Sequence, residues 1–316
     1  MIELRRNAAR IFTALAAAAF LVSCGGSDDD GPPQPAFGQV TYVFGASVSD
    51  TGNTCDLIPA NCPPTPPYAA GRFSNGQLFA EIVAARYGAG VTPSRTGGNN
   101  FAYAGARTGP IAGTTQGVPN MVAQLDQYLA RVNFQSSANA LFIVDGVTVG
   151  NDIVDALTLA QTNPNAPTTV LTGAVTNVVT IINRLYASGA RNILIANSAD
   201  VGKTPRAQAL GPTASAGATQ LSAQFNGALA QQIAQIRPNS PGLNLYVLDV
   251  FALNAEAIAN PAALGYTNVM APCFNDLVAP PTLCAAPATY FYWDSFHPSA
   301  TTHSIAAQRG IAAIGR

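Results

Sequence analysis

Four short β-prone apolar runs alternate with longer segments of helical periodicity, and this alternation constrains the fold more than any other feature. The apolar runs cover residues 40–44, 141–144, 192–196 and 245–248. Apolar side chains recur at helical spacing in residues 75–87, 118–132, 174–188, 213–236 and 299–314. Strands that alternate with helices favour a parallel sheet covered by helices on both faces. The sequence therefore predicts an α/β chain folded as a three-layer α/β/α sandwich.

Composition excludes one large class of function. The chain has 316 residues, 48% of them hydrophobic, which is enough for a large buried core. Only 10% of its residues are charged, its formal net charge is −1, and Lys203 is its sole lysine. Proteins that bind the phosphate backbone of nucleic acids need a basic surface. Nucleic acid is therefore excluded as a partner.

The N-terminal residues have the organisation of an export signal. Three arginines precede an apolar run at residues 11–22, which is too short to span a bilayer. The run closes on a sequence that resembles a bacterial lipobox, in which the cysteine thiol receives a diacylglycerol. We therefore predict a lipoprotein signal peptide at residues 1–23 and lipidation of Cys24. An ordinary cleaved signal with an incidental cysteine is the alternative.

A polar, Pro-rich segment at residues 24–38 carries too few apolar side chains to fold, and we interpret it as a flexible tether. The remaining residues, 39–316, are predicted to form one domain, since no internal repeat or break demands a second. Gly25 follows Cys24 where an aspartate is associated with inner-membrane retention. The expected location is the bacterial cell envelope, lipid-anchored at the outer membrane, or outside the cell.

Four cysteines follow the tether, at positions Cys55, Cys62, Cys273 and Cys284. An even number of cysteines in an exported chain favours two disulfides, and the sequence alone permits three pairings. The local pairs, Cys55 with Cys62 and Cys273 with Cys284, are favoured because each closes a short Pro-containing loop. Free structural thiols are the alternative. A metal site is not expected, because the chain has two histidines and no ligand-spaced cluster.

A loop of small residues follows the first predicted strand, and it contains Ser47. Ligands of open α/β sheets bind at the carboxyl ends of the strands, so a serine at this place is a candidate nucleophile. Serine is also a preferred helix N-cap, and Ser47 taken alone fits that structural role at least as well.

Near the C-terminus, Asp294 stands three residues before His297. This spacing lets one turn orient the imidazole ring and fix its tautomer. The only other histidine, His303, lies among Thr and Ser residues of the last helical segment and is predicted to be on the surface. Asp294 and His297 are therefore the candidate partners of Ser47 in a catalytic triad. A turn bridged by a local hydrogen bond is the alternative.

Acyl transfer also requires hydrogen-bond donors aimed at a developing oxyanion. Gly105 lies in a glycine-containing segment that a substrate could approach closely, and Asn151 follows the predicted strand at residues 141–144. The backbone N–H groups of Ser47 and Gly105, with the side-chain amide of Asn151, would form a three-donor oxyanion hole. A tight turn at Gly105 and a helix cap at Asn151 are the structural alternatives.

The candidate residues resemble, in their order along the chain, the four sequence blocks of the SGNH (GDSL-like) hydrolases. Those blocks match Ser47, Gly105, Asn151 and His297, and Asp294 occupies the family's Asp-x-x-His position. Further similarity is found in residues 71–76, 185–191 and 260–266, so the resemblance extends from residue 40 to the C-terminus. It implies a flavodoxin-like sandwich with a mostly parallel five-stranded sheet. We expect no cofactor and a monomeric protein.

The resemblance also implies hydrolysis of carboxylic esters, of lipid or short-chain acyl type, through an acyl-enzyme intermediate. Acyl transfer to an alcohol acceptor, deacetylation of sugars and binding by an inactive esterase scaffold in the envelope are the alternatives. Three positions depart from the family pattern. Ala46 stands where the family has an aspartate, which predicts a looser nucleophile loop; Val149 replaces a common glycine; and Asp145 is unusual at the end of a buried strand.

Overall fold

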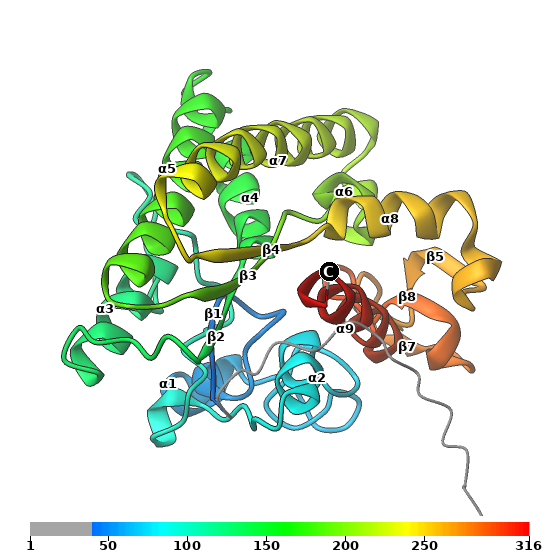
Figure 1. Cartoon of the computed structure of the whole chain (residues 1–316). Helices are drawn as coiled ribbons and strands as arrows, with labels where there is room; N and C mark the ends of the chain where they lie inside the picture. Colours follow the sequence, from blue (N-terminus) through cyan, green and yellow to red (C-terminus); the bar gives the residue numbers. More distant parts are fainter. Residues whose placement is uncertain (1–39, 316) are drawn as a thin grey trace, which may run out of the picture. The chain divides into compact units, whose positions relative to one another are not determined.

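The computed structural model describes residues 40–315. The predicted signal peptide at residues 1–23, the predicted lipidation site Cys24 and the predicted tether at residues 24–38 lie outside the described residues. Within the described range, strands and helices alternate along the chain as the sequence predicts (Figure 1).

The centre of the fold is a parallel sheet of four strands in the order β1, β2, β3, β4. The strands are β1 (Thr41–Phe44), β2 (Leu141–Asp145), β3 (Asn192–Ala196) and β4 (Asn244–Leu248). All residues of β2 and β3 are buried, because helices cover both faces of the sheet (Figure 1). The parallel register places Ser47, after β1, and Asn151, after β2, at the same end of the sheet.

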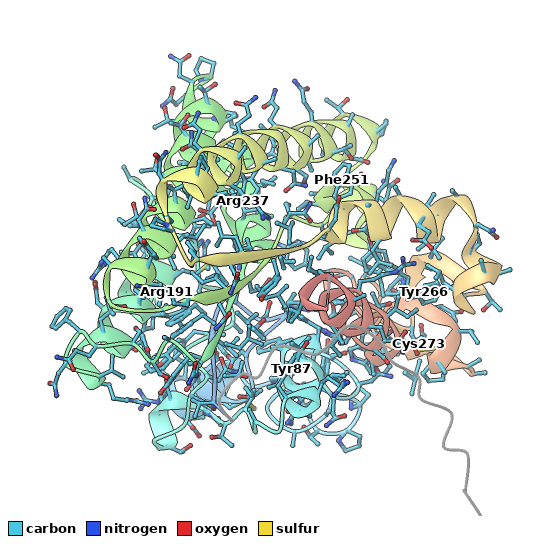
Figure 2. All side chains as sticks on the ribbon, in the orientation of Figure 1. Tyr87, Arg191, Arg237, Phe251, Tyr266 and Cys273 are labelled. Carbon is cyan, nitrogen blue, oxygen red and sulfur yellow. A yellow bond between two sulfur atoms is a disulfide. The ribbon has the colours of Figure 1, made fainter. Side chains whose placement is uncertain are left out.

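Helices form a layer on each face of the sheet, and side chains fill the space between the layers (Figure 2). Successive strand residues face opposite layers, so Phe44 and Phe142 belong to one core and Val43 and Ile143 to the other. The first layer contains α3 (Met121–Arg131), α4 (Val149–Leu159), α5 (Ala166–Ala187) and α7 (Pro212–Asn239). The second contains α2 (Phe79–Arg86), α8 (Val250–Ala259) and α9 (Ala300–Ile314). The predicted three-layer sandwich is confirmed.

The prediction of a five-stranded sheet is wrong in the number of strands, since the main sheet has four in the part of the chain that the structure describes. The outer edge of β1 is covered instead by residues 99–103. Val43 N–H donates to Asn99 O at 3.1 Å, and Phe101 N–H donates to Val43 O at 2.8 Å. The segment forms only an isolated bridge to β1, since the next donor along the same edge, the Gly45 N–H, bonds to the Gln124 side chain instead. The Asn53 side chain donates to two carbonyls of the segment, those of Asn100 and Ala102. With this segment in place of a strand, the spatial order is that of flavodoxin-like sheets.

Two short strand pairs and two disulfides lie outside the main sheet. The pairs are β5 (Asn268–Pro272) with β8 (Tyr290–Tyr292), in parallel, and β6 (Phe274–Asn275) with β7 (Thr282–Leu283), antiparallel. The disulfides are Cys55–Cys62 and Cys273–Cys284, which are the two local pairings that the sequence favours. β8 leads directly into the turn that contains the predicted acid and base.

Several helices differ from the sequence expectation. Helix α5 begins at Ala166 rather than at residue 174, and α4 and α8, which follow β2 and β4 closely, are not indicated by the apolar periodicity. The short helices α1 (Asn53–Leu57) and α6 (Pro205–Ala209) are also new. Helix α8 begins where it does because Asp249 is its N-cap: the Asp249 carboxylate accepts the Ala252 N–H in the first turn.

Candidate active site

Ser47 meets the distant pair Asp294 and His297 at the end of the sheet, in a continuous hydrogen-bonded series. Ser47 Oγ lies 2.9 Å from His297 Nε2. His297 Nδ1 lies 2.8 Å from Asp294 Oδ2 and 3.0 Å from Asp294 Oδ1. Ser47 is supplied by the loop after β1, and the other two residues by the turn after β8. The structure therefore brings together the serine, imidazole and carboxylate that the sequence singles out.

The Asp294 carboxylate is fixed by several donors besides His297. Its Oδ1 accepts the backbone N–H groups of Phe296 and His297 at 2.8 and 2.7 Å, and its Oδ2 accepts the Tyr68 hydroxyl at 2.8 Å. Burial by itself would raise the pKa of Asp294, but the His297 ring and these backbone donors hold it below its ordinary value. Burial and the adjacent carboxylate raise the pKa of the Tyr68 hydroxyl, which therefore remains a donor.

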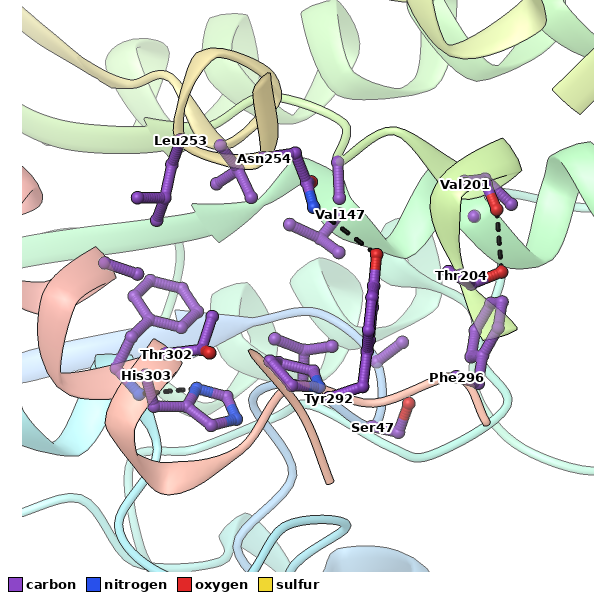
Figure 3. A pocket seen from close by; sticks show the side chains of 18 of the residues that line it. Ser47, Val147, Val201, Thr204, Leu253, Asn254, Tyr292, Phe296, Thr302 and His303 are labelled. Atoms are coloured by element: carbon purple, nitrogen blue, oxygen red, sulfur yellow. Dashed lines mark hydrogen bonds between the residues drawn. The ribbon is translucent and has the colours of Figure 1, made fainter. Parts of the chain in front are cut away.

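An apolar pocket lies beside Ser47, between the end of the sheet and helices α8 and α9 (Figure 3). Most of its lining is hydrocarbon, from residues that include Val147, Val201, Leu248, Leu253, Phe291 and Phe296. Asn151 and Ser47 line the same pocket. An apolar pocket with a few polar groups at one end is the usual form of a small-molecule site. Residues 40–315 contain no group of three or more His, Cys, Asp or Glu side chains that could hold a metal ion.

The prediction that His303 is on the surface is wrong. His303 is only 1% exposed, and it lines the pocket beside Ser47. Its Nδ1 accepts the backbone N–H of Phe79, the first residue of α2, at 3.1 Å. Helix α9 packs against α2, and the buried face of α9 starts with the polar residues Thr302 and His303 before it continues with apolar residues. Because the first turn of that face is polar, apolar periodicity could not indicate that His303 is buried.

The three predicted oxyanion donors are available for hydrogen bonds. Asn151 Nδ2 donates one hydrogen to Ala106 O at 2.8 Å, which places the Gly105-containing loop beside Asn151 and leaves the second amide hydrogen free to donate. Gly105 has a φ of 80°, a left-handed conformation that favours glycine. Within residues 40–315, neither the Ser47 N–H nor the Gly105 N–H donates to another protein group. Gly105 itself is exposed and does not line the pocket.

Side chains of α4 hold the loop that carries Gly105. Arg107 forms a two-pronged ion pair with Asp155, at 2.7 and 2.8 Å. The Thr108 hydroxyl and N–H both donate to the buried Asp152 carboxylate. Since α4 also carries Asn151, the Gly105 loop and the Asn151 amide are both held by this one helix.

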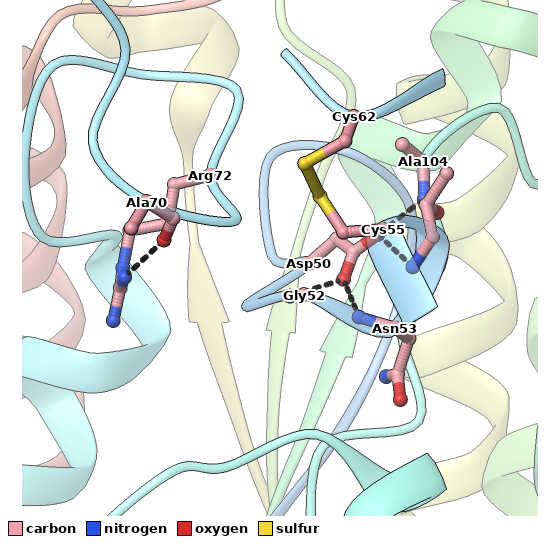
Figure 4. The surroundings of a disulfide bond; sticks show 9 residues. Asp50, Gly52, Asn53, Cys55, Cys62, Ala70, Arg72 and Ala104 are labelled. Carbon is pink, nitrogen blue, oxygen red and sulfur yellow. Dashed lines mark hydrogen bonds between the residues drawn. A yellow bond between two sulfur atoms is a disulfide. The ribbon is translucent and has the colours of Figure 1, made fainter. Parts of the chain in front are cut away.

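The nucleophile loop is organised by the buried carboxylate of Asp50 (Figure 4). Its Oδ1 accepts the N–H groups of Gly52 and Asn53, each at 2.8 Å. Its Oδ2 accepts the N–H groups of Thr54 and Ala104, at 3.1 and 2.9 Å. Asp50 therefore joins the nucleophile loop to the segment that covers the edge of β1.

Asp145, which the sequence leaves without explanation, binds the nucleophile loop through Ser49. It is fully buried at the end of β2, its Oδ2 accepts the Ser49 hydroxyl at 2.7 Å, and its Oδ1 accepts the Val147 N–H at 3.1 Å. A side chain on Gly45 would place its Cβ 2.7 Å from the Asp145 Cβ, so this close approach requires glycine. Burial raises the pKa of Asp145 to about 6.

Comparisons with known proteins show the family to which this chain belongs. The profile of the family described as GDSL-like Lipase/Acylhydrolase matches residues 42–309, a range that includes all the candidate site residues. The chain belongs to the GDSL-like lipase/acylhydrolase family. Ester hydrolysis, which the sequence resemblance implies, agrees with this membership.

Individual relatives of this GDSL-like hydrolase are plant proteins. GDSL esterase/lipase At1g73610 of Arabidopsis thaliana is 28% identical, over 90% of this chain and 92% of its own length. GDSL esterase/lipase At5g63170 of the same plant is 27% identical, over 81% and 85% of the two chains. Among solved structures, the lipase Lip_vut3 from goat rumen metagenome is 13% identical with a TM-score of 0.46, and the match covers 87% of this chain and 97% of that chain. These names give no support to a bacterial lipid anchor, which stays a prediction.

Sequence reasoning missed two residues that hold the site together. Tyr68 follows a Pro-rich loop far from Asp294 in the sequence, and no motif spacing connects the two. Asp50 had a usable signal, because an aspartate two residues before a glycine often binds the following backbone N–H groups in a turn.

Proposed function

We propose that this chain hydrolyses carboxylic esters with Ser47 as nucleophile, His297 as general base and Asp294 as the carboxylate that orients the imidazole. His297 Nε2 takes the hydroxyl proton as Ser47 Oγ attacks the ester carbonyl carbon. The carbonyl oxygen becomes an oxyanion, which the N–H groups of Ser47 and Gly105 and the Asn151 amide stabilise. Collapse of this intermediate expels the alcohol, which receives the proton from His297.

The second half of the reaction restores the enzyme. His297 takes a proton from water, the resulting hydroxide attacks the acyl carbon, and the acid leaves as Ser47 recovers its proton. Asp294 stays ionised throughout and stabilises the imidazolium in both steps, in agreement with the direction of its pKa shift.

The observation that carries this proposal is the series of short contacts from Asp294 through His297 to Ser47, at 2.8 and 2.9 Å, beside an apolar pocket. A serine that only capped a helix would not need an imidazole at its hydroxyl. The triad and the oxyanion donors come from one chain, which supports action as a monomer.

A fluorophosphonate probe tests the proposal directly, because it reacts with activated serines. The wild-type protein is expected to take the label and to hydrolyse p-nitrophenyl acyl esters, and Ser47→Ala is expected to do neither. Ser137→Ala is the matched control, since Ser137 is exposed and far from the triad in sequence. A Ser47→Ala protein that kept full esterase activity would refute the mechanism.

We propose further that the protein is exported and carries a lipid on Cys24, with residues 39–316 as its catalytic domain. The lipobox-like sequence at the end of the apolar run supports lipidation. Two disulfides support folding in an oxidising compartment. Metabolic labelling with a fatty-acid analogue tests lipidation: the wild type should incorporate label and Cys24→Ser should not. A wild-type protein without label would contradict it.

A further inference from the structure

Two residues that line the pocket beside Ser47 each carry a buried polar atom that has no hydrogen-bond partner. Among the described residues, four buried side-chain N or O atoms lack a partner, and two of them, His303 Nε2 and Thr148 Oγ1, belong to residues of this one lining. Buried polar groups in native proteins are nearly always hydrogen-bonded, so each exception needs an explanation. Two exceptions in a pocket next to a candidate nucleophile point to a ligand that carries a polar atom.

The protonation of His303 can be assigned from its surroundings. Its Nδ1 accepts the Phe79 N–H, so Nδ1 carries no proton. Burial, with a smaller contribution from His297, lowers the pKa of His303 to about 3, so the ring is neutral at ordinary pH. The ring proton is therefore on Nε2. His303, a residue of the pocket lining, thus carries a hydrogen-bond donor that has no acceptor in the described protein.

Four other polar side chains of the lining already have hydrogen-bond partners in the protein. Ser47 is bonded to His297, and the Thr204 and Thr302 hydroxyls donate to backbone carbonyls at 2.7 Å. The Tyr292 hydroxyl accepts the Asn254 amide at 3.4 Å (Figure 3). Apart from Thr148, Asn151 and Asn254, the remaining side chains of the lining are hydrocarbon and offer no acceptor to a histidine donor.

The position and size of the pocket indicate which part of an ester it holds. Figure 3 shows Ser47 and Phe296 on one side of Tyr292, with His303 and Thr302 on the other. The cavity volume is about 70 Å³. A single water requires roughly 10–15 Å³ by this measure, so the cavity has room for a short chain of non-hydrogen atoms and not for a long one. That is a short acyl chain.

We propose that this pocket binds the acyl part of the ester and that His303 Nε2–H donates a hydrogen bond to an oxygen within that chain. The inference rests on the proposed esterase function and deepens it. The preferred substrates are esters of short acids that carry a ketone or hydroxyl oxygen on the chain, in addition to the ester group. His303 is thus a specificity-determining residue, and Ser47, His297 and Asp294 perform the chemistry.

Two substitutions separate the donor from the structural role of His303. Asn at this position can place its carbonyl oxygen where Nδ1 accepts the Phe79 N–H, but it has no group at the Nε2 position. Gln can place its amide nitrogen at the Nε2 position and so keeps a donor there. His303→Asn therefore removes the donor, and His303→Gln is the conservative variant that should rescue it.

The assay compares p-nitrophenyl hexanoate with three derivatives that carry one ketone on the third, fourth or fifth carbon of the chain. A ketone oxygen only accepts hydrogen bonds, so it reports on a donor in the pocket. For at least one derivative, the wild type is expected to show a kcat/KM about tenfold higher than for hexanoate, the contribution of one good hydrogen bond. This ratio should fall to about one in His303→Asn and should be largely retained in His303→Gln.

The outcomes separate the inference from the esterase function. A wild type that takes no fluorophosphonate label and cleaves none of the four esters overturns both. A wild type that is labelled and cleaves hexanoate but prefers no ketone ester overturns the inference alone. So does a labelled His303→Asn protein that keeps the wild-type ratio. The wild-type preference is measured independently of the variants. The inference can therefore be refuted even if a variant fails to fold.

Discussion

The hydrogen bond from Tyr68 to the candidate catalytic carboxylate makes a prediction about stability. The Tyr68 hydroxyl donates to Asp294 Oδ2 at 2.8 Å, and Asp294 is 3% exposed, so water cannot readily replace the donor. The substitution Tyr68→Phe removes the hydroxyl and keeps the ring, which packs against Trp293 and Phe274. Its effect therefore isolates one hydrogen bond to a buried charge.

The expected loss of unfolding free energy is about 1.5–3 kcal/mol, the range for a hydrogen bond to a charged group. Its pH dependence follows from the depressed pKa of Asp294. A carboxylate with a folded-state pKa below its unfolded value stabilises the protein above the unfolded pKa, and that stability is lost as the pH falls through the folded pKa. The difference between wild type and Tyr68→Phe should therefore be full at neutral pH and should shrink below about pH 4, the ordinary range of an aspartate.

Urea unfolding of the disulfide-intact protein, at about pH 7 and at steps down to about pH 3, measures this difference. Tyr128→Phe is the matched control, because the buried Tyr128 hydroxyl bonds to the neutral Ser136 hydroxyl at 3.0 Å. The control should lose only about 0.5–1.5 kcal/mol, with no change over this pH range. If Tyr68→Phe lost no more than the control, or lost the same amount at every pH, the reasoning about a buried, ionised Asp294 would be wrong.

Two further predictions concern the oxyanion donors and the buried carboxylate below the nucleophile loop. Asn151→Ala should lower kcat roughly 10²- to 10³-fold, with a much smaller effect on KM, in steady-state assays. Asn139→Ala is the control, because Asn139 is exposed. An unchanged kcat would show that Asn151 is not one of the oxyanion donors. Asp145 has a pKa raised to about 6, so the wild type should lose stability relative to Asp145→Asn, by about 2–3 kcal/mol, as the pH rises from about 4 to 7. Unfolding curves that differ by a constant amount across this range would contradict it.

Local patterns predicted most of the fold, and tertiary contacts decided the rest. The central strands were recognisable because burial on both faces requires continuous apolar runs, as in β2 and β3. Residues 99–103, which occupy the place of the fifth strand, begin with polar residues and have no such run. Their position depends on the Asn53 amide, which comes from a loop that the sequence does not connect to them.

In the candidate site, too, some residues could be recognised from local sequence motifs and others depend on tertiary contacts. Ser47, Asp294 and His297 were recognisable because each stands in a short motif whose geometry is local, and the fold had only to bring the motifs together. Tyr68 and His303 have no local motif. The role of each depends on the residues that pack around it, and hydrophobic periodicity does not indicate the burial of an individual polar side chain.

The structure bears on one of the two departures that raised the alternative of an inactive scaffold, Ala46 and the altered asparagine block at Val149. The aspartate usual at position 46 is missing, and a looser nucleophile loop was expected. Ala46 is instead buried in a small cluster with Tyr103 and Ala106. The loop is held by the four backbone bonds to Asp50 and by the bond from Ser49 to Asp145. Because two buried carboxylates fix the loop around Ser47, the hydroxyl stays in contact with His297 without a charged side chain at position 46.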